Sequence, residues 1–375
     1  MSTVCDVLVV GAGVVGAACA FELAREGLRV TVIDGEGAGT GATAASMGHI
    51  VVMDDSEAQF ALTRYSQTLW DELEPRLPSN VEFERCGTLW VAAGEEEMRE
   101  VRRKCAFYRE RRVKVEILDS KGVREAEPNL RTPLAGGLFV PGDSVLYPPC
   151  AAAFLLGEAC VHGAQLRVGQ PVVGIACGRA NLADGTVFTA SFIINAAGQS
   201  APKLVPKINI RPRKGHLVIT DRYPGFIHHQ LIELGYLKSA HLNANDSVAF
   251  NVQPRKTGQL LIGSSRQYAA EDKGVDPRIL SRMLNRAFEY VPALASVSAT
   301  RVWTGFRAAT PDKLPLIGPW PGDPTIFLAA GHEGLGITTS LATGRIVADQ
   351  VLGRNTGIPS GPYLPSRQME AEVHA

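Results

Sequence analysis

The feature that most constrains this chain is a glycine-rich turn between a buried strand and a helix, close to its start. The apolar run Val7–Val10 leads into Gly11, Gly13 and Gly16, and an apolar helical pattern follows. In such a turn Gly11 permits the tight bend, Gly13 lets phosphates approach backbone N–H groups, and Gly16 lets helix and strand pack closely. The positive end of the helix then faces the ligand. The pattern predicts a cradle for a dinucleotide pyrophosphate.

An acidic residue at the expected distance strengthens this prediction. Asp34 follows the predicted strand Leu28–Ile33, about 20 residues after the turn, where its carboxylate can accept hydrogen bonds from ribose hydroxyls. Val14, Val15 and Gly35 belong to the same unit, and we expect them beside the dinucleotide. A glycine-rich turn in an ordinary α/β protein is the alternative interpretation.

Length and charge restrict the class of protein and ligand. With 375 residues the chain is long enough for two domains. Its 38 Lys and Arg balance its 38 Asp and Glu, so no overall field favours nucleic acid or an anionic membrane surface. No run approaches the roughly 18 apolar residues of a membrane span, and Met1–Cys5 shows no signal-peptide pattern. We expect a cytoplasmic protein with a small-molecule ligand, no nucleic-acid partner and no membrane span.

The cysteines give no sign of a disulfide framework or a metal site. The chain has 7 of them, an odd number, and none are in C-x-x-C spacing. Cysteine-ligated iron–sulfur clusters are not supported for the same reason. We therefore expect no metal.

Changes in pattern along the chain predict two domains. The continuously apolar run Phe192–Gly198 ends in small residues and is typical of a buried parallel strand that ends at a ligand. Short strand-like runs from Arg213 to Ser264, including Leu231–Leu237, favour an antiparallel sheet, and Pro277–Tyr290 has the pattern of an amphipathic helix. The predicted class is α/β, α+β overall. We expect a Rossmann-like nucleotide domain from 1–80, 148–212 and 300–360, an antiparallel-sheet substrate domain from 81–147 and 213–299, and a loosely ordered tail at 361–375.

Five motifs follow one another along the chain. They are Gly11–Gly16 with Asp34, Gly39–Gly48, Ile194–Gly198, Gly305–Gly318 and Gly331–His332. In this order they resemble the D-amino-acid oxidase superfamily, and within it the pattern is most similar to glycine oxidase, sarcosine oxidase and the flavin subunits of D-hydroxyproline dehydrogenase. The resemblance implies FAD rather than NAD, and oxidation of a C–N bond next to a carboxylate; an NAD-dependent dehydrogenase is the alternative.

Several turns of small residues are spread as a long, buried flavin requires. They lie near residues 11, 41, 198 and 331. Thr43 and Ser46 can donate to the pyrophosphate or to the flavin edge, and the resemblance implies that Val172 presents its backbone to the adenine. Backbone N–H groups of residues 332–337 are expected near the flavin pyrimidine ring, where they stabilise negative charge on the reduced ring. The other predicted cofactor residues are Ala44, Met47, Gly48, Ala197, Gly198, Gly331, His332, Glu333, Gly334, Leu335, Gly336 and Ile337.

Arg307 is the predicted anchor for the substrate. Such a reaction moves a hydride from the α-carbon to flavin N5, so the protein must mainly hold the carboxylate and keep the amine unprotonated. The planar fork of an arginine bonds a carboxylate in bidentate fashion. The resemblance places Arg307 where the family keeps its carboxylate-binding arginine. A structural ion pair is the alternative role.

His49 and Asn251 are two further candidates for the catalytic site. His49 follows Gly48 in the segment expected at the reactive edge of the flavin, where it can accept a proton from the amine or tune the flavin. A buried, hydrogen-bonded histidine or a covalent link to the flavin are the alternatives. Asn251 lies where relatives place a substrate-facing tyrosine, and an inward-pointing polar residue needs a partner. Its alternative is a hydrogen bond to neighbouring backbone.

Three departures from the family pattern bear on the reaction. Glu333–Gly334 stands where glycine oxidase has a further arginine, and no cysteine follows Cys177 to form the cysteinyl flavin link of monomeric sarcosine oxidase. The run Gly263–Arg266 has no lysine where sarcosine oxidase uses one to activate oxygen, which favours a dehydrogenase, although Arg266 can substitute.

The segments Gly48–Asp55 and Leu261–Gln267 look more like the D-hydroxyproline dehydrogenase flavin subunits than like glycine oxidase. We therefore expect oxidation of a D-amino or imino acid, D-hydroxyproline by preference, with electrons passing to an acceptor or partner subunit. One alternative is a glycine or sarcosine oxidase that makes hydrogen peroxide. The other is a flavin electron-relay subunit of a larger complex.

Overall fold

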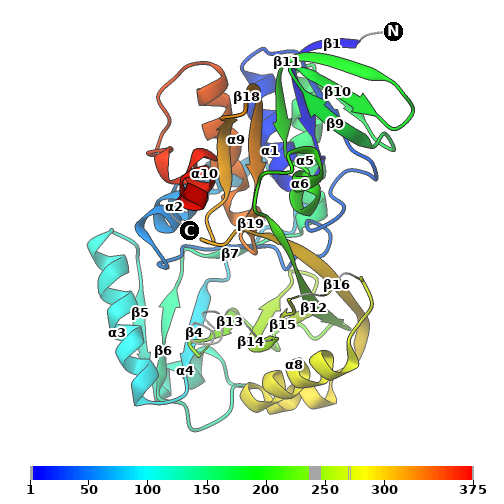
Figure 1. The fold of residues 1–375 in the computed structure, drawn as a ribbon. Helices are drawn as coiled ribbons and strands as arrows, with labels where there is room; N and C mark the ends of the chain where they lie inside the picture. Colours follow the sequence, from blue (N-terminus) through cyan, green and yellow to red (C-terminus); the bar gives the residue numbers. More distant parts are fainter. Residues whose placement is uncertain (1–2, 236–245, 269, 271, 374–375) are drawn as a thin grey trace.

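Two sheets of different construction organise the protein (Figure 1). The computed structural model describes residues 3–235, 246–268, 270 and 272–373. One sheet has parallel strands at its centre, and the other is mainly antiparallel. The predicted mixed α/β class, with a Rossmann-like part and an antiparallel part, is confirmed.

The first sheet has a parallel core, and the glycine turn follows directly from its middle strand. The central order is β17-β18-β11-β1-β2-β8, with β10 and β9 attached through β11. β2 is buried at every position, as expected for a strand covered on both faces. The strands are β1 (Thr3–Val10), β2 (Val30–Ile33), β8 (Gln165–Arg167), β9 (Val172–Ala176), β10 (Arg179–Leu182), β11 (Val187–Asn195), β17 (Leu316–Trp320) and β18 (Asp323–Ala330).

Three helices pack together beside this sheet. They are α1 (Val14–Arg25), α5 (Pro148–Val161) and α9 (Gly336–Val351), and α2 (Glu57–Leu73) packs against α9. The contact between α1 and α9 is close because Gly344 has no side chain. A Cβ there would lie 2.6 Å from the carbonyl oxygen of Ala18. This packing fixes α1 and α9, each of which begins at a glycine-containing turn.

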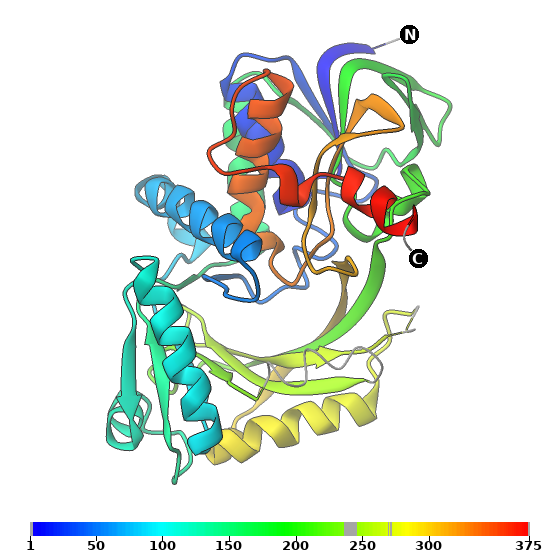
Figure 2. The ribbon, with the colours of Figure 1, turned by 60° about the vertical axis from the view of Figure 1, so that its left-hand side comes forward.

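The second sheet is curved, and its outer side carries helices (Figure 2). Its order is β19-β16-β12-β15-β14-β13-β4-β6-β5. α8 (Pro277–Tyr290) packs on β14 and β15, and α3 (Glu95–Glu110) packs on β4, β5 and β6. The strands are β4 (Thr88–Ala92), β5 (Glu116–Asp119), β6 (Gly136–Val140), β12 (Arg211–Thr220), β13 (Gln230–Glu233), β14 (Ser247–Pro254), β15 (Leu260–Arg266), β16 (Ala299–Ala309) and β19 (His332–Glu333).

The remaining elements are short. β3 (His49–Ile50) and β7 (Ser144–Val145) form a small antiparallel pair. The others are α4 (Ser120–Ala126), α6 (Ala201–Leu204), α10 (Ser366–Val373), and the 3₁₀ turns η1 (Glu74–Arg76), η2 (Ser79–Val81), η3 (Gly198–Ser200), η4 (Pro292–Ser296) and η5 (Gly361–Tyr363).

The structure differs from several predicted boundaries, and three of the differences change the assignment of a segment. β16 pairs with β12 along its length, so residues 300–309 belong to the second sheet and not to the nucleotide part. The tail predicted to be loosely ordered contains η5 and α10, because Tyr363 is buried and its hydroxyl donates to the carbonyl of Ala58 at 2.6 Å. The strand predicted at Leu231–Leu237 ends at Glu233, and residues 236, 237, 374 and 375 lie outside the described part of the chain.

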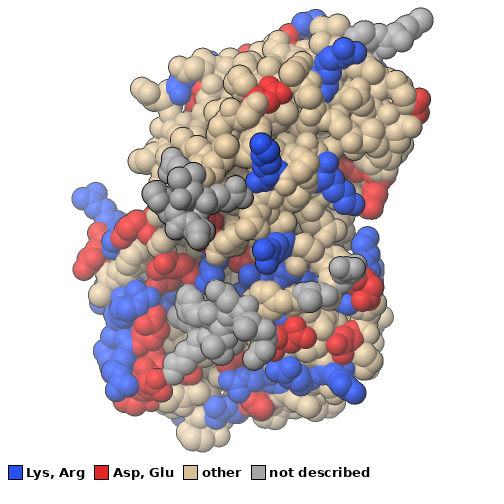
Figure 3. All heavy atoms as spheres, in the orientation of Figure 1, with Lys and Arg blue, Asp and Glu red and all other residues tan. Residues whose placement is uncertain are grey.

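Figure 3 shows how charge is distributed on one face. Lys and Arg lie beside Asp and Glu around the second sheet and its helices, while the upper part of this face has few charges. Within the described residues, no helix combines the length and the apolar character needed to cross a membrane.

Candidate active site

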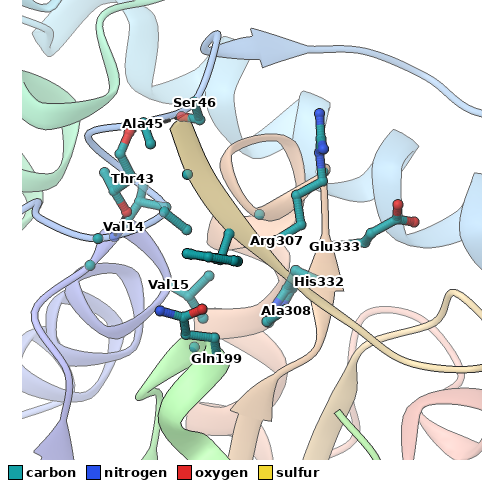
Figure 4. Close-up of a pocket in the computed structure, with 18 of the residues that line it drawn as sticks. Val14, Val15, Thr43, Ala45, Ser46, Gln199, Arg307, Ala308, His332 and Glu333 are labelled. Atoms are coloured by element: carbon teal, nitrogen blue, oxygen red, sulfur yellow. Dashed lines mark hydrogen bonds between the residues drawn. The ribbon is translucent and has the colours of Figure 1, made fainter. Parts of the chain in front are cut away.

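A cavity of about 830 Å³ extends from the glycine turn of the first sheet to the face of the second sheet (Figure 4). Val14, Thr43 and Ser46 lie on one side of the close-up, and Arg307 and Glu333 lie on the other. We call the part of the cavity around Gly11, α1 and Asp34 the nucleotide end. The part lined by the second sheet is the substrate end.

The glycine turn has the geometry of a dinucleotide cradle. Gly11 has a φ of +111°, and a Cβ there would lie 2.5 Å from the carbonyl oxygen of Ala196. A Cβ at Gly16 would lie 1.9 Å from the carbonyl oxygen of Gly11, and one at Gly13 would lie 3.2 Å from Thr43 Oγ1. Because backbone fills the space at Gly11 and Gly16, both positions require glycine. The N-terminus of α1 therefore opens into the cavity, as a pyrophosphate requires.

The segment after this cradle is tied to the start of α1. The N–H of Val14 donates to Thr43 Oγ1 at 3.0 Å, which leaves the hydroxyl proton of Thr43 for a ligand. The hydroxyl of Ser46 donates to the carbonyl of Thr43 at 2.9 Å. This bond closes the local turn, and donation by Ser46 to the cofactor stays a prediction.

Asp34 both shapes the turn and lines the cavity. Its Oδ2 accepts the N–H of Ala12 at 2.8 Å, and its Oδ1 accepts the N–H groups of Glu36 at 2.7 Å and Gly37 at 2.9 Å. A carboxylate offers about four lone-pair sites. These three bonds therefore leave acceptor capacity on the cavity side, where a ribose hydroxyl can bind.

Nearly all the predicted cofactor residues line this one cavity. Gly16 is an exception because it lies inside the turn. Gly48 is the other exception because it packs against backbone, where a Cβ would lie 2.1 Å from the carbonyl oxygen of Leu146. The predicted residues that line it are Gly11, Gly13, Val14, Val15, Asp34, Gly35, Thr43, Ala44, Ser46, Met47, Val172, Ala197, Gly198, Gly331, His332, Glu333, Gly334, Leu335, Gly336 and Ile337.

A second glycine turn brings the start of α9 to the cavity. Gly331 has a φ of +84°, and a Cβ there would lie 2.6 Å from Thr310 Cγ2. His332 Nε2 lies 3.0 Å from Thr343 Oγ1, whose own proton goes to the carbonyl of Thr339, so Nε2 carries the imidazole proton. Burial lowers the pKa of His332 to about 3, so the ring is neutral. Because His332 is neutral, the positive charge of this turn comes from the N-terminal end of α9.

Arg307 reaches the substrate end because glycines make room for it. Trp303, Gly305 and Arg307 alternate along β16 and share one face. Arg307 Nη1 donates to the carbonyl of Ser265 at 2.9 Å. On the neighbouring strand β12, a Cβ at Gly215 would lie 2.5 Å from the same Nη1. The guanidinium therefore lies over a glycine of β12 and is held by β15.

A chain of hydrogen bonds supports the Ser265 carbonyl. His216 Nε2 accepts the N–H of Asp276, so its proton is on Nδ1, which donates to Ser265 Oγ at 2.9 Å. Burial lowers the pKa of His216, and the nearby positive charge of Lys214 acts in the same direction. The neutral imidazole thus connects the start of α8 to the residue that holds Arg307.

Glu333 lies among several cations at this end of the cavity. It forms an ion pair with Arg213, and its Oε1 lies 3.7 Å from Arg266 Nε. Burial by itself would raise the pKa of Glu333, but the positive charges of Arg266, Arg213 and Arg307 together hold that pKa below its ordinary value. Glu333 is therefore ionised, and the substrate end keeps an excess of positive charge suited to a carboxylate.

His49 lines the cavity in its neutral form. Burial, and then the positive charge of Arg307, lowers the pKa of His49 to about 4, although contact with the backbone of Gly334 opposes this. Its Nδ1 is buried without a hydrogen-bond partner among the described residues. The carbonyl of His49 accepts the hydroxyl of Thr338 at 2.9 Å, which ties β3 to α9.

Asn251 also lines the cavity, on β14 opposite Gly263 of β15. Its side-chain oxygen has no hydrogen-bond partner within the described part of the chain. The alternative role, an oxygen bonded to neighbouring backbone, is therefore not seen.

Several residues that line the cavity were missed by sequence reasoning. Arg213, Gly215 and Leu217 line the cavity from alternate positions of β12, so a period of two from Arg213 was an available signal. Trp90 and Gln230 reach the cavity through the parallel pairing of β4 with β13, which no local pattern predicts. Gln199, in η3 after β11, is likewise beside the nucleotide end.

Comparison with known proteins defines the family. The model of the DAO family, described as FAD dependent oxidoreductase, matches residues 6–350, so the chain belongs to this family. It is an FAD-dependent oxidoreductase. The predicted resemblance is confirmed.

Individual relatives cover almost the whole chain. Glycine oxidase from Geobacillus kaustophilus is 29% identical over 97% of each chain, and its crystal structure superposes with a TM-score of 0.87, at 28% identity over 98% of this chain and 99% of that one. Hydrogen cyanide synthase subunit HcnC from Pseudomonas aeruginosa is 28% identical over 98% of this chain and 97% of the relative. D-amino acid dehydrogenase from Xanthobacter autotrophicus is 25% identical over 97% and 99%.

Proposed function

We propose that this protein oxidises the C–N bond of a small D-amino or imino acid, with D-hydroxyproline as its preferred substrate, and passes the electrons to a carrier. The observation that carries this proposal is the position of Arg307. Its guanidinium lies in the cavity, held by the Ser265 carbonyl over the bare backbone of Gly215. A planar fork in an enclosed site suits a substrate carboxylate.

We infer that FAD extends along the cavity from the nucleotide end. The turn at Gly11–Gly16 and Asp34 would hold the pyrophosphate and ribose, and the start of α9 would face the flavin pyrimidine ring. When bound, the flavin accepts the hydride that leaves the substrate α-carbon. The protein's own task is then to place that carbon and to exclude water.

His49 is proposed to receive the substrate amine. With a pKa near 4 its imidazole is neutral at physiological pH, so the buried Nδ1 can accept a hydrogen bond from the amine without repelling a positive charge. Asn251 offers a further acceptor on the facing sheet. Covalent attachment of flavin to His49 is the competing role, and acid precipitation that leaves all the flavin in solution would exclude it.

The proposal that the electrons pass to a carrier and not to oxygen rests on residues of the substrate end. The run Gly263–Arg266 contains no lysine, and the similarity to a D-amino acid dehydrogenase supports the same choice. Purified holoenzyme should reduce an artificial dye with substrate while consuming little oxygen. Rapid oxygen uptake with hydrogen peroxide formation would instead identify a glycine or sarcosine oxidase.

A non-catalytic electron-relay subunit is the candidate from another class. Similarity to a hydrogen cyanide synthase subunit makes association with a partner subunit worth testing. Anaerobic bleaching of the isolated protein's flavin by an amino acid would reject the non-catalytic role. The useful panel is both enantiomers of proline, both hydroxyproline epimers, glycine and sarcosine. The cytoplasmic location stays a prediction.

Replacing Arg307 by Leu tests the carboxylate anchor. Each charge-assisted hydrogen bond contributes roughly 1.5–3 kcal/mol, so KM should rise at least about tenfold. The flavin absorbance of the purified variant should stay unchanged, because Arg307 is at the substrate end. Loss of FAD with an unchanged KM would contradict the assignment.

A further inference from the structure

Three polar side chains at the substrate end are almost completely buried and have atoms without hydrogen-bond partners. Trp90, Gln230 and Asn251 are 2%, 1% and 8% exposed, and all three line the cavity. Within the described residues, Trp90 Nε1, Asn251 Oδ1 and both amide atoms of Gln230 have no partner. None of the three is accounted for by binding a substrate carboxylate.

Strand pairing places these side chains on one face of the second sheet. Ile232 of β13 pairs with Trp90 on one side and with Asn251 on the other, so the three residues form a row. Gln230 precedes Ile232 by two positions and therefore points to the same face. Ile232 itself lies between Trp90 and Asn251, and Gln230 lies two residues before it on β13, opposite Thr88 of β4 and about 6.6 Å along the strand.

This group begins next to the arginine anchor. Asn251 is opposite Gly263, two residues before Ser265, whose carbonyl accepts the Arg307 guanidinium. Gln230 and Trp90 follow on β13 and β4, farther across the sheet from Arg307. A substrate whose carboxylate binds Arg307 would thus extend its carbon skeleton over Asn251 toward Gln230.

The chemistry of the group identifies what binds there. A buried polar atom without a partner is unfavourable because it has lost its hydrogen bonds to water, and native proteins rarely leave several together. Trp90 supplies a donor, Asn251 an acceptor and Gln230 both, and none of them carries charge. A hydroxyl group, which donates one hydrogen bond and accepts others, matches this set. An ionised group would leave part of it unsatisfied.

We propose that Trp90, Gln230 and Asn251 form a subsite that binds a hydroxyl group of the substrate, on the part of its carbon skeleton remote from the carboxylate. This inference rests on the proposed function, because it takes Arg307 as the carboxylate anchor. It assigns selection of a hydroxylated over a plain imino acid to the second sheet, with Gln230 supplying both a donor and an acceptor.

Gln230→Met, an apolar replacement of similar length, tests the subsite. The native enzyme should have a higher kcat/KM for D-hydroxyproline than for D-proline, since a site built to bond a hydroxyl discriminates against the analogue without it. In the variant, kcat/KM should fall about tenfold or more for D-hydroxyproline and stay within about twofold for D-proline. The matched control is Gln165→Met, exposed on β8 of the first sheet and outside the cavity lining, which should leave the ratio unchanged.

Binding to the reduced holoenzyme provides a readout without turnover. With the flavin reduced by dithionite and oxygen excluded, calorimetry should give tighter binding for D-hydroxyproline than for D-proline in the native protein. Gln230→Met should remove that difference. Equal binding of both ligands by the native protein, or equal weakening of both by the variant, would overturn the subsite.

The two proposals fail in different ways. If no member of the amino-acid panel bleaches the flavin, the proposed function is wrong, whatever the variant does. If D-proline and D-hydroxyproline both bleach it at equal rates in native protein and variant, the oxidation of imino acids stands, and the preference for D-hydroxyproline and the hydroxyl subsite are wrong.

Discussion

The two ends of the cavity are built in opposite ways. The nucleotide end is made of backbone, because at Gly11 and Gly16 an added Cβ would meet carbonyl oxygens at 2.5 and 1.9 Å. The substrate end is made of long side chains on the strands of a curved sheet, with Arg307 placed over Gly215. Backbone cannot move aside, whereas the end of an arginine can. Substitutions at the nucleotide end should therefore abolish FAD binding. Those at the substrate end should weaken substrate binding by degrees and leave FAD bound.

The largest effect is expected for Gly16→Ala. The new Cβ would lie 1.9 Å from the Gly11 carbonyl oxygen, so the turn and the start of α1 must shift. We expect protein without flavin, measured by the absorbance near 450 nm, roughly where oxidised flavin absorbs. Gly37→Ala, whose Cβ would have an ordinary contact of 3.6 Å with Thr40 Cγ2, is the matched control and should retain FAD. Full FAD occupancy in Gly16→Ala would contradict the claim that the nucleotide end has no space for an added side chain.

Gly215→Ala should have an intermediate and selective effect. Its Cβ would lie 2.5 Å from Arg307 Nη1, which is the end of a flexible side chain, so the guanidinium moves and the fold survives. KM should rise about tenfold, through loss of roughly one well-aligned charged hydrogen bond, while FAD content is unchanged. Gly174→Ala on β9, with its nearest neighbour at 3.8 Å, should change neither. A flavin-free Gly215→Ala protein would show that the two ends are not separable.

The smallest effect concerns a carboxyl group behind the substrate end. Asp143 Oδ1 accepts the N–H of Val52 and the amide of Gln67, each at 3.2 Å, and so supports the segment beside His49. Burial raises the pKa of Asp143 to about 7, against opposing hydrogen bonds. Between its ordinary pKa of about 3.8 and 7 the folded state binds more protons than the unfolded state, so this contribution to stability is lost as the pH rises through 7.

Asp143→Asn removes that titration. The melting temperature of the variant minus that of the native protein should be larger at pH 8.5 than at pH 6, by on the order of a few degrees. The comparison of variant with native protein cancels the other titrating groups. Parallel melting curves at both pH values would contradict a raised pKa for Asp143.

Local patterns predicted the elements well where a single segment carried the signal. The helix Pro277–Tyr290 is confirmed with the same bounds, because its apolar stripe follows an N-terminal Asp276 that caps it. The nucleotide turn was equally predictable from the sequence, since Gly11, Gly13, Gly16 and Asp34 lie within one βαβ unit. The assignment of 300–309 failed because β16 continues the second sheet through pairing with β12, which is remote in sequence.

The sequence by itself determined the nucleotide end, because glycines at fixed spacing and one acid encode a local backbone shape. The FAD family came from the resemblance of five ordered motifs, not from that shape. Only the tertiary structure decided how the substrate end is assembled. There Arg307, Ser265 and Gly215 come from three strands, and Trp90, Gln230 and Asn251 come from three others. Their meeting depends on strand register across a curved sheet, and register is set by long-range pairing that no short segment contains.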